Sequence, residues 1–248
     1  MMYLDHIVHH VTKKPEEVAE DWNAKGFHAV VGGQHTHWGT YNALLYTKTS
    51  YIEWLAIEHE EIAKNANHPL VNLLLHDIKN SPGFGTICIR TTEINELCQQ
   101  LELKCIETSG VLHAERKTAS GLVRKWKMLF VKEEVSDDLP TPFFIEWEES
   151  DLERYQLLQE DGTINASNVE LSISACEFHV KSPREVMKKW KRYFDITEQD
   201  EQTLLLSNTK LVFKKLDSGA KERLAMVHID GCIEQDTFIY EHAPYLFR

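Results

Sequence analysis

Two short stretches of the chain place a carboxylate inside an apolar, aromatic-rich run. Residues 51–54 read Tyr-Ile-Glu-Trp and residues 144–147 read Phe-Ile-Glu-Trp, so Glu53 and Glu146 lie 93 positions apart (146 − 53 = 93). Each run predicts a strand, in which successive side chains point to opposite faces. A glutamate there needs water, a cationic partner or a metal, because an unpaired buried charge is too costly. We therefore expect a duplicated module that brings one glutamate from each copy to a shared cleft.

His6 is the imidazole whose position in a predicted strand, residues 4–11, suggests chemistry. It shares a face of that strand with Leu4, Val8 and His10. From the residues alone, a hydrogen-bonded core histidine is the simpler interpretation, and a metal ligand is the alternative. A Lys or Arg on a neighbouring strand would likewise explain each glutamate.

A loop after the Gly-Gly pair at residues 32–33 carries several polar side chains. Loop side chains can reach a substrate, which makes His35, His37, Thr40 and Asn42 candidate substrate-binding residues. The alternative is that Thr40 and Asn42 satisfy backbone groups in a tight turn. A basic cluster over residues 116–127 could meet an anionic substrate, although a solvated hairpin is the simpler interpretation. The sequence has no Gly-rich phosphate loop, no Gly-x-Ser-x-Gly elbow and no His-Glu-x-x-His helix.

Composition restricts the class of partner. The 248 residues include 27 Lys and Arg against 39 Asp and Glu, a net charge of −12, which argues against nucleic acid or an anionic membrane surface. No apolar run approaches the roughly 18 residues of a spanning helix, and no secretory signal precedes the first strand. Five cysteines without paired spacing indicate free thiols in a reducing compartment. We expect a cytoplasmic protein with a small-molecule partner.

The order of predicted elements repeats along the chain. Each of the first two blocks reads strand, helix, then three strands; the strands are residues 4–11, 27–31, 41–47 and 51–57, then 85–90, 104–108, 125–132 and 142–147. The polar interval 151–168 is predicted to be a linker. A third block repeats the Pro-Val-Trp spacing of the first, at residues 183, 186 and 190 against 15, 18 and 22. The expected class is α+β: paired βαβββ modules over residues 1–150 and a third over 169–248.

Several motifs resemble the vicinal-oxygen-chelate superfamily, and within it the glyoxalase-like group. They are Leu-Asp-His-Ile-Val at residues 4–8, Gly-Gly-Gln-His at 32–35, Gly-Thr-Tyr-Asn-Ala-Leu at 39–44 and Tyr-Ile-Glu at 51–53. The stretch ending in Pro-Phe-Phe-Ile-Glu-Trp at 142–147 is also similar. The resemblance covers residues 3–150 and implies paired βαβββ modules whose sheets curl around a metal-containing cleft.

The resemblance also implies a ligand set. By position, the ligands of the first and last strands of each module correspond to His6, Glu53 and Glu146, while Thr86 occupies the place where many members have a second histidine. One imidazole and two carboxylates suit Fe(II), Mn(II), Ni(II) or Zn(II) alike, so a divalent metal is expected without an identity.

The implied function is a lyase or isomerase of glyoxalase type. The metal would polarise a carbonyl or a vicinal oxygen pair, and Glu53 or Glu146 would transfer a proton at the adjacent carbon. The alternatives are a non-catalytic protein that sequesters a small molecule, and an extradiol-type dioxygenase, which usually needs the second histidine that Thr86 replaces. Modules of this superfamily work in pairs, so we expect the third module to pack beside the first two or to pair with its twin in a homodimer.

Overall fold

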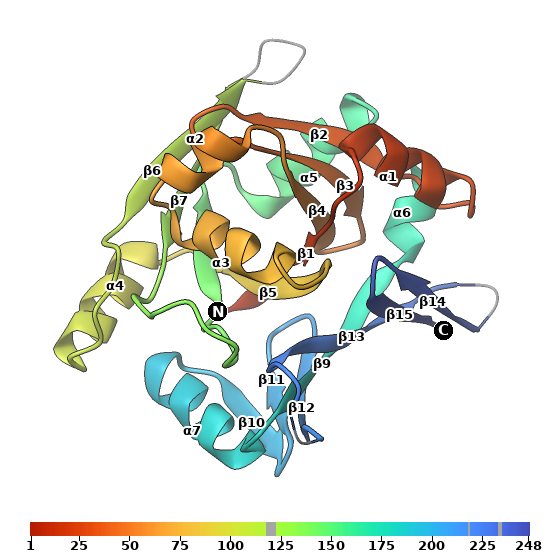
Figure 1. Cartoon of the computed structure of the whole chain (residues 1–248). Helices are drawn as coiled ribbons and strands as arrows, with labels where there is room; N and C mark the ends of the chain where they lie inside the picture. The colour runs from red at the N-terminus through yellow and green to blue at the C-terminus, as the bar shows by residue number, and fades with distance from the viewer. Residues whose placement is uncertain (118–122, 218, 233–234) are drawn as a thin grey trace.

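The computed structural model describes residues 1–117, 123–217, 219–232 and 235–248 (Figure 1). Its helices are α1 (Pro15–Asn23), α2 (Glu60–Asn65), α3 (Pro69–Ile78), α4 (Ile94–Leu103), α5 (Asp151–Glu160), α6 (Ala166–Glu170) and α7 (Pro183–Tyr193). The strands of the first sheet are β1 (Tyr3–His10), β2 (Val30–His35), β3 (Thr40–Tyr46), β4 (Tyr51–Ile57), β5 (Gly83–Arg90), β6 (Leu112–Lys117), β7 (Val123–Leu129) and β8 (Phe143–Trp147). Those of the second are β9 (Ser172–Val180), β10 (Thr197–Asp200), β11 (Thr203–Leu205), β12 (Lys210–Lys215), β13 (Arg223–Asp230), β14 (Asp236–Tyr240) and β15 (Ala243–Phe247).

The first sheet joins two βαβββ modules through their first strands. Its order is β2-β3-β4-β1-β5-β8-β7-β6, with β1 antiparallel to β5 and Ile7 opposite Ile87. In each module the last strand returns parallel to the first, β4 beside β1 and β8 beside β5. The two halves are therefore related by an approximate two-fold axis near Ile7 and Ile87. This confirms the predicted α+β class and its repeated modules.

Apolar side chains at helical spacing hold α1 against the sheet. Pro15 opens the helix, where its missing N–H costs nothing, and Val18 and Trp22 are buried one and two turns later. The predicted strand at residues 104–108 is different in the structure, which forms an isolated bridge at Thr108 and begins β6 at Leu112. Cys105 adopts a positive φ of 56°, so the chain turns there as it leaves α4.

The second sheet repeats the arrangement of the first within the same chain. Its order is β10-β11-β12-β9-β13-β15-β14, with β12 parallel to β9 and β9 antiparallel to β13. Strands β13, β15 and β14 thus take the places that β5, β8 and β7 have in the first sheet. The third module, from β9 through α7 to β12, finds its partner strands here rather than lacking one. The sequence hid this half-module because no helix separates β13 from β14.

The interval expected to be a linker forms α5 and α6, which cover one end of the first sheet. Ser150 caps α5 by accepting a hydrogen bond from the backbone N–H of Glu153, 3.3 Å away. Leu158 and Ile164 pack against Tyr46 on the sheet. The interval looks polar in sequence because most of its other side chains face solvent.

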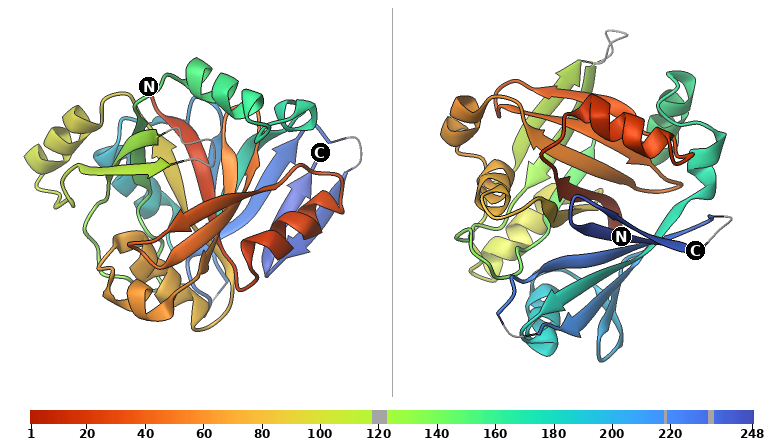
Figure 2. Two further views of the ribbon diagram at one scale, coloured as in Figure 1. Left: turned by 90° about the horizontal axis from the view of Figure 1, so that it is seen from above. Right: turned by 45° about the vertical axis from the view of Figure 1, so that its right-hand side comes forward.

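The two sheets meet along β1 and α1. Figure 2 shows β14 and β15 beside α1, where Trp22 contacts Tyr245 with ring centroids 5.0 Å apart. Two polar contacts fix β1 from the second sheet's side. Asn208 accepts from the backbone N–H of Leu4 at 2.7 Å and donates to its carbonyl at 3.0 Å, and the His9 Nδ1 lies 2.8 Å from the Tyr245 hydroxyl.

His9 predicts an acid-sensitive interface between the sheets. Burial lowers the pKa of His9 to about 3, opposed by the Glu241 carbonyl and reinforced by His10. The unfolded chain binds a proton near pH 6.5, its ordinary value, whereas the native state does not until about pH 3, so stability falls as the pH drops below 6.5. We expect His9→Gln to remove about 1.4 kcal/mol per pH unit from the pH dependence of unfolding between pH 6 and 5, measured by urea denaturation. Identical slopes in the two proteins would contradict this assignment.

Candidate functional site

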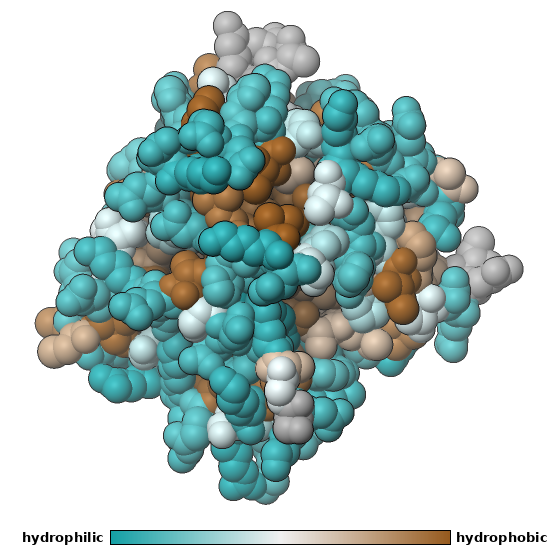
Figure 3. Space-filling model, viewed as in Figure 1, coloured by the Kyte–Doolittle hydropathy of each residue, from teal (hydrophilic) through white to brown (hydrophobic). Residues whose placement is uncertain are grey.

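A small cavity of about 70 Å³ opens on the concave face of the first sheet. Alternate residues of β4 and β8 line it, because side chains on one face of a strand recur every second residue; these are Tyr51, Glu53 and Leu55 on β4 and Phe143, Ile145 and Trp147 on β8. Residues of β1, β3, β7 and α3 complete the wall. Figure 3 shows hydrophobic atoms in a hollow on this face, over the region of α2, β3 and β4.

His6 and Glu53 converge at the wall of this cavity. The His6 Nε2 lies 3.6 Å from the Glu53 Oε2, and both residues are buried. The side-chain amide of Asn42 donates to the other oxygen, Glu53 Oε1, at 2.6 Å. The Tyr51 ring stacks on the His6 imidazole with centroids 4.5 Å apart. One nitrogen and one carboxylate oxygen therefore face the cavity while their outer atoms are fixed.

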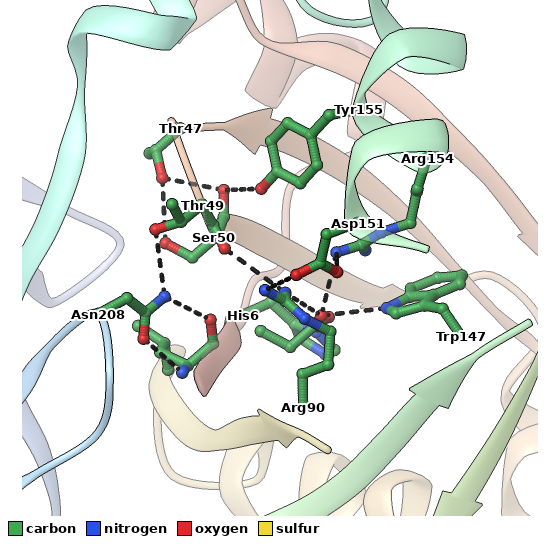
Figure 4. Close-up of polar contacts among 12 residues, drawn as sticks. His6, Thr47, Thr49, Ser50, Arg90, Trp147, Asp151, Arg154, Tyr155 and Asn208 are labelled. Carbon is green, nitrogen blue, oxygen red and sulfur yellow. Dashed lines mark hydrogen bonds and ion pairs between the residues drawn. The ribbon is translucent and has the colours of Figure 1, made fainter. Parts of the chain in front are cut away.

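Asp5 orients the imidazole from behind. Its Oδ1 lies 2.8 Å from the His6 Nδ1, so that nitrogen donates to the carboxylate and the Nε2 lone pair faces Glu53. The Asp5 side chain is completely buried, and Figure 4 shows cationic and indole groups from distant segments meeting there. Its Oδ2 accepts from Arg90 at 2.9 Å and from the Trp147 indole at 3.0 Å, with Arg154 at 3.5 Å.

This environment decides the charge of Asp5. Burial alone would raise its pKa, but the Arg154 guanidinium, the bond from His6 and the Arg90 guanidinium together hold that pKa well below its ordinary value. Sequence reasoning did not select Asp5. The available signal was an aspartate next to His6 inside a predicted strand, where a buried acid needs a cationic partner.

Glu146 is not brought together with His6 and Glu53. Its Oε2 accepts from the backbone N–H of Ile94 at the start of α4, 2.8 Å away, and its Oε1 accepts from Lys127 at 2.6 Å. Burial raises the pKa of Glu146, but the Ile94 and Lys127 contacts outweigh it and lower the net pKa. The neighbours Ile145 and Trp147 line the cavity, so Glu146 points to the other face of β8.

The register of the sheet explains why the repeated motif is misleading. Val8 lies opposite Glu53, and the equivalent pair in the second module is Cys88 opposite Phe143. The structural counterpart of Glu53 is therefore Phe143, 90 positions away (143 − 53), rather than Glu146 at 93. The difference of three residues is odd and reverses the face.

The second module supplies no metal ligand at the two equivalent positions. Thr86 takes the place of His6, as expected, at the 80-residue offset that also relates Ile7 to Ile87 (86 − 6 = 87 − 7). Phe143 takes the place of Glu53 and presents its ring edge to the His6 imidazole, with centroids 5.5 Å apart. The candidate site is thus built mainly from the first module.

Three of the four predicted substrate-binding residues line the cavity. Thr40 and Asn42 are buried on β3, and His35 lies at the end of β2 with its Nδ1 3.0 Å from the Thr40 hydroxyl. His37 is exposed in the turn that joins the two strands. Gly39 makes this turn possible, because its φ is +64° and a Cβ there would lie 2.5 Å from the His59 carbonyl oxygen.

The His6–Glu53 pair fits one divalent cation. Histidine nitrogen and carboxylate oxygen bind such ions at about 2.0–2.2 Å, so two donors separated by 3.6 Å can share one ion. A second grouping, Asp5, His6 and Cys88, has donor atoms within 4.8 Å of one another. It does not suit a cation, because Asp5 already neutralises two guanidinium groups and burial raises the pKa of the Cys88 thiol well above its ordinary value.

Paired βαβββ modules around a histidine–carboxylate cleft define a protein of the vicinal-oxygen-chelate type. The family model for the glyoxalase-like domain matches residues 4–194, and the chain belongs to this family. The match extends through α7, past the two paired modules of the first sheet. A comparison with curated protein sequences found no match.

Solved structures similar to the chain fall into two groups. A hypothetical protein from Staphylococcus aureus is 25% identical, with a TM-score of 0.85, and the alignment covers 100% of this chain and 99% of that chain. Hypothetical protein BH1468 from Bacillus halodurans is 17% identical (TM-score 0.40, 60% of this chain and 95% of that chain). Methylmalonyl-CoA epimerase from Mycobacterium tuberculosis is also 17% identical (TM-score 0.39, 59% and 87%). The first similarity extends over both sheets.

We expect Asp5→Asn to destabilise the protein by about 3–5 kcal/mol, since it leaves buried guanidinium groups without their counter-charge. Urea denaturation at pH 7 measures the loss. Asp151→Asn is the matched control, because the Asp151 side chain also binds Arg90, at 2.8 Å, but is 51% exposed. It should cost no more than about 1 kcal/mol. Equal losses in the two variants would refute the central role of Asp5.

Proposed function

We propose that the chain is a glyoxalase-like enzyme of the lyase or isomerase class, acting on a small oxygen-bearing substrate. The observation that carries the proposal is the convergence of His6 Nε2 and Glu53 Oε2 in a buried cavity. Family membership supports the same class of chemistry. In this proposal Glu53 moves a proton at the carbon next to a carbonyl, and His6 faces the carbonyl oxygen.

The surroundings of Glu53 suit proton transfer. Asn42 holds Oε1, which leaves Oε2 as the oxygen that accepts and returns the proton. Asp5 keeps the proton of His6 on Nδ1, so that Nε2 remains available as a donor atom. A divalent cation held by His6 Nε2 and Glu53 would supply Lewis-acid polarisation of the substrate oxygen. Tyr51 and Phe143 shield the pair from bulk water.

A non-catalytic binding protein of the same fold is the second candidate. The specific observation in its favour is that Thr86 and Phe143 occupy the two positions equivalent to His6 and Glu53, which leaves fewer ligands for an ion. The same replacement of a second histidine by Thr86 disfavours an extradiol-type dioxygenase. Glu146, proposed from sequence as a ligand and proton carrier, has no part in the present proposal, because Ile94 and Lys127 hold it on the other face.

Hydrogen exchange at carbon tests the proposal. We expect the metal-loaded protein to exchange the α-protons of one or more small oxo acids or ketoaldehydes in D₂O, followed by ¹H NMR. Glu53→Gln should slow the exchange by about 10²-fold or more, because the proton acceptor is lost. Glu146→Gln is the matched control and should retain the wild-type rate.

Metal content separates the two candidates. For untagged protein we expect about one equivalent of a divalent ion and a thermal shift when metal is added, both lost in His6→Gln. Less than about a tenth of an equivalent, no thermal shift and no exchange in the panel would contradict the enzyme and favour the binding protein.

The homodimer and the cytoplasmic location remain proposals. In the part of the chain that the structure describes, none of the helices has the length and apolar character needed to cross a membrane. We expect light scattering to give a mass twice that of one chain. A single-chain mass over the working concentration range would contradict the dimer.

A further inference from the structure

Arg124 is a buried cation with an unused donor. It lies on β7 with 3% of its surface exposed and lines the same cavity as His6 and Glu53. Its Nη2 is 3.4 Å from the Asp161 carboxylate, whereas its Nη1 has no hydrogen-bond partner among the described residues and is shielded from water. The guanidinium is always protonated, so this nitrogen keeps its N–H groups at any working pH.

The charges around the cavity leave Arg124 undercompensated. Arg90 and Arg154 are neutralised by Asp5, and Lys127 is neutralised by Glu146 on the other face of the sheet. Asp161 contacts Arg124 at a distance beyond an ordinary charged hydrogen bond, and about a third of its side chain is exposed. An unpaired N–H of a buried charged group is costly, which indicates an acceptor that the folded chain does not itself supply.

We propose that Arg124 binds the carboxylate of the substrate, which makes the substrate a short carboxylic acid with a second, carbonyl or hydroxyl, oxygen. A carboxylate supplies both the negative charge and the acceptor lone pair that Nη1 lacks. The cavity holds only a small molecule, and Trp126 and Met128, on the same face of β7 as Arg124, give that side an apolar wall. The second oxygen would then face His6 and Glu53, a step that rests on the proposed function.

Isothermal titration tests the subsite without requiring turnover. The probes are acetate, pyruvate, lactate and malonate, with pyruvamide as the uncharged counterpart of pyruvate and inorganic phosphate as the other oxyanion. We expect the wild type to bind at least one carboxylate and to bind pyruvamide more weakly than pyruvate. Arg124→Gln should weaken carboxylate binding by about tenfold or more, and Arg124→Lys should restore part of it.

Lys125→Gln provides the charge-matched control, because Lys125 is the next residue on β7 and is exposed. It should change carboxylate binding by less than about twofold. The urea midpoint of unliganded Arg124→Gln should equal or exceed that of the wild type, which shows that a loss of binding is not a loss of folding.

Several results would overturn the inference: no carboxylate binds the wild type, Arg124→Gln and Lys125→Gln act alike, or phosphate binds more tightly than every carboxylate. The proposed function can fail separately. If Arg124→Gln abolishes carboxylate binding while Glu53→Gln leaves proton exchange unchanged, the subsite stands and the catalytic role of Glu53 falls.

Discussion

The buried carboxylate of Asp5 is the group around which the site is assembled. It joins β1 to β5 through Arg90, to β8 through the Trp147 indole and to α5 through Arg154. A carboxylate with no exposed surface is tolerated only because these donors compensate its lost hydration. The same contacts leave one oxygen for His6, so the interaction that holds the segments together also fixes the ring that faces the cavity.

The approximate two-fold symmetry of the first sheet offers two half-sites, and the chain equips one of them. His6 and Glu53 belong to the first module, whereas Thr86 and Phe143 stand at the equivalent positions of the second. An asymmetric cleft of this kind offers few protein ligands to an ion and leaves space for a substrate on the opposite wall. Arg124, contributed by the second module's β7, supplies a charge on that wall.

Much of the fold could be predicted from the sequence, because strand alternation and the Pro-Val-Trp spacing are local patterns. The site could be predicted only in part. His6, Glu53 and Asn42 follow from the first-module motifs, but Glu146 was selected from a repeated motif whose register in the sheet differs by three residues. Asp5 and Arg124 depend on contacts between segments more than 30 residues apart, such as Arg154 with Asp5 and Arg124 with Asp161. No local pattern reports those contacts.

The central claim is that His6 and Glu53 act together as one chemical centre in the cavity. A crystal structure of the protein grown with Mn²⁺ or Zn²⁺ tests it most directly through the anomalous signal of the ion. The account predicts a peak about 2.0–2.3 Å from both His6 Nε2 and a Glu53 oxygen, with Asp5 still bonded to His6 Nδ1. A peak at Cys88 or Glu146, or a cavity in which Glu53 has turned away from His6, would contradict it.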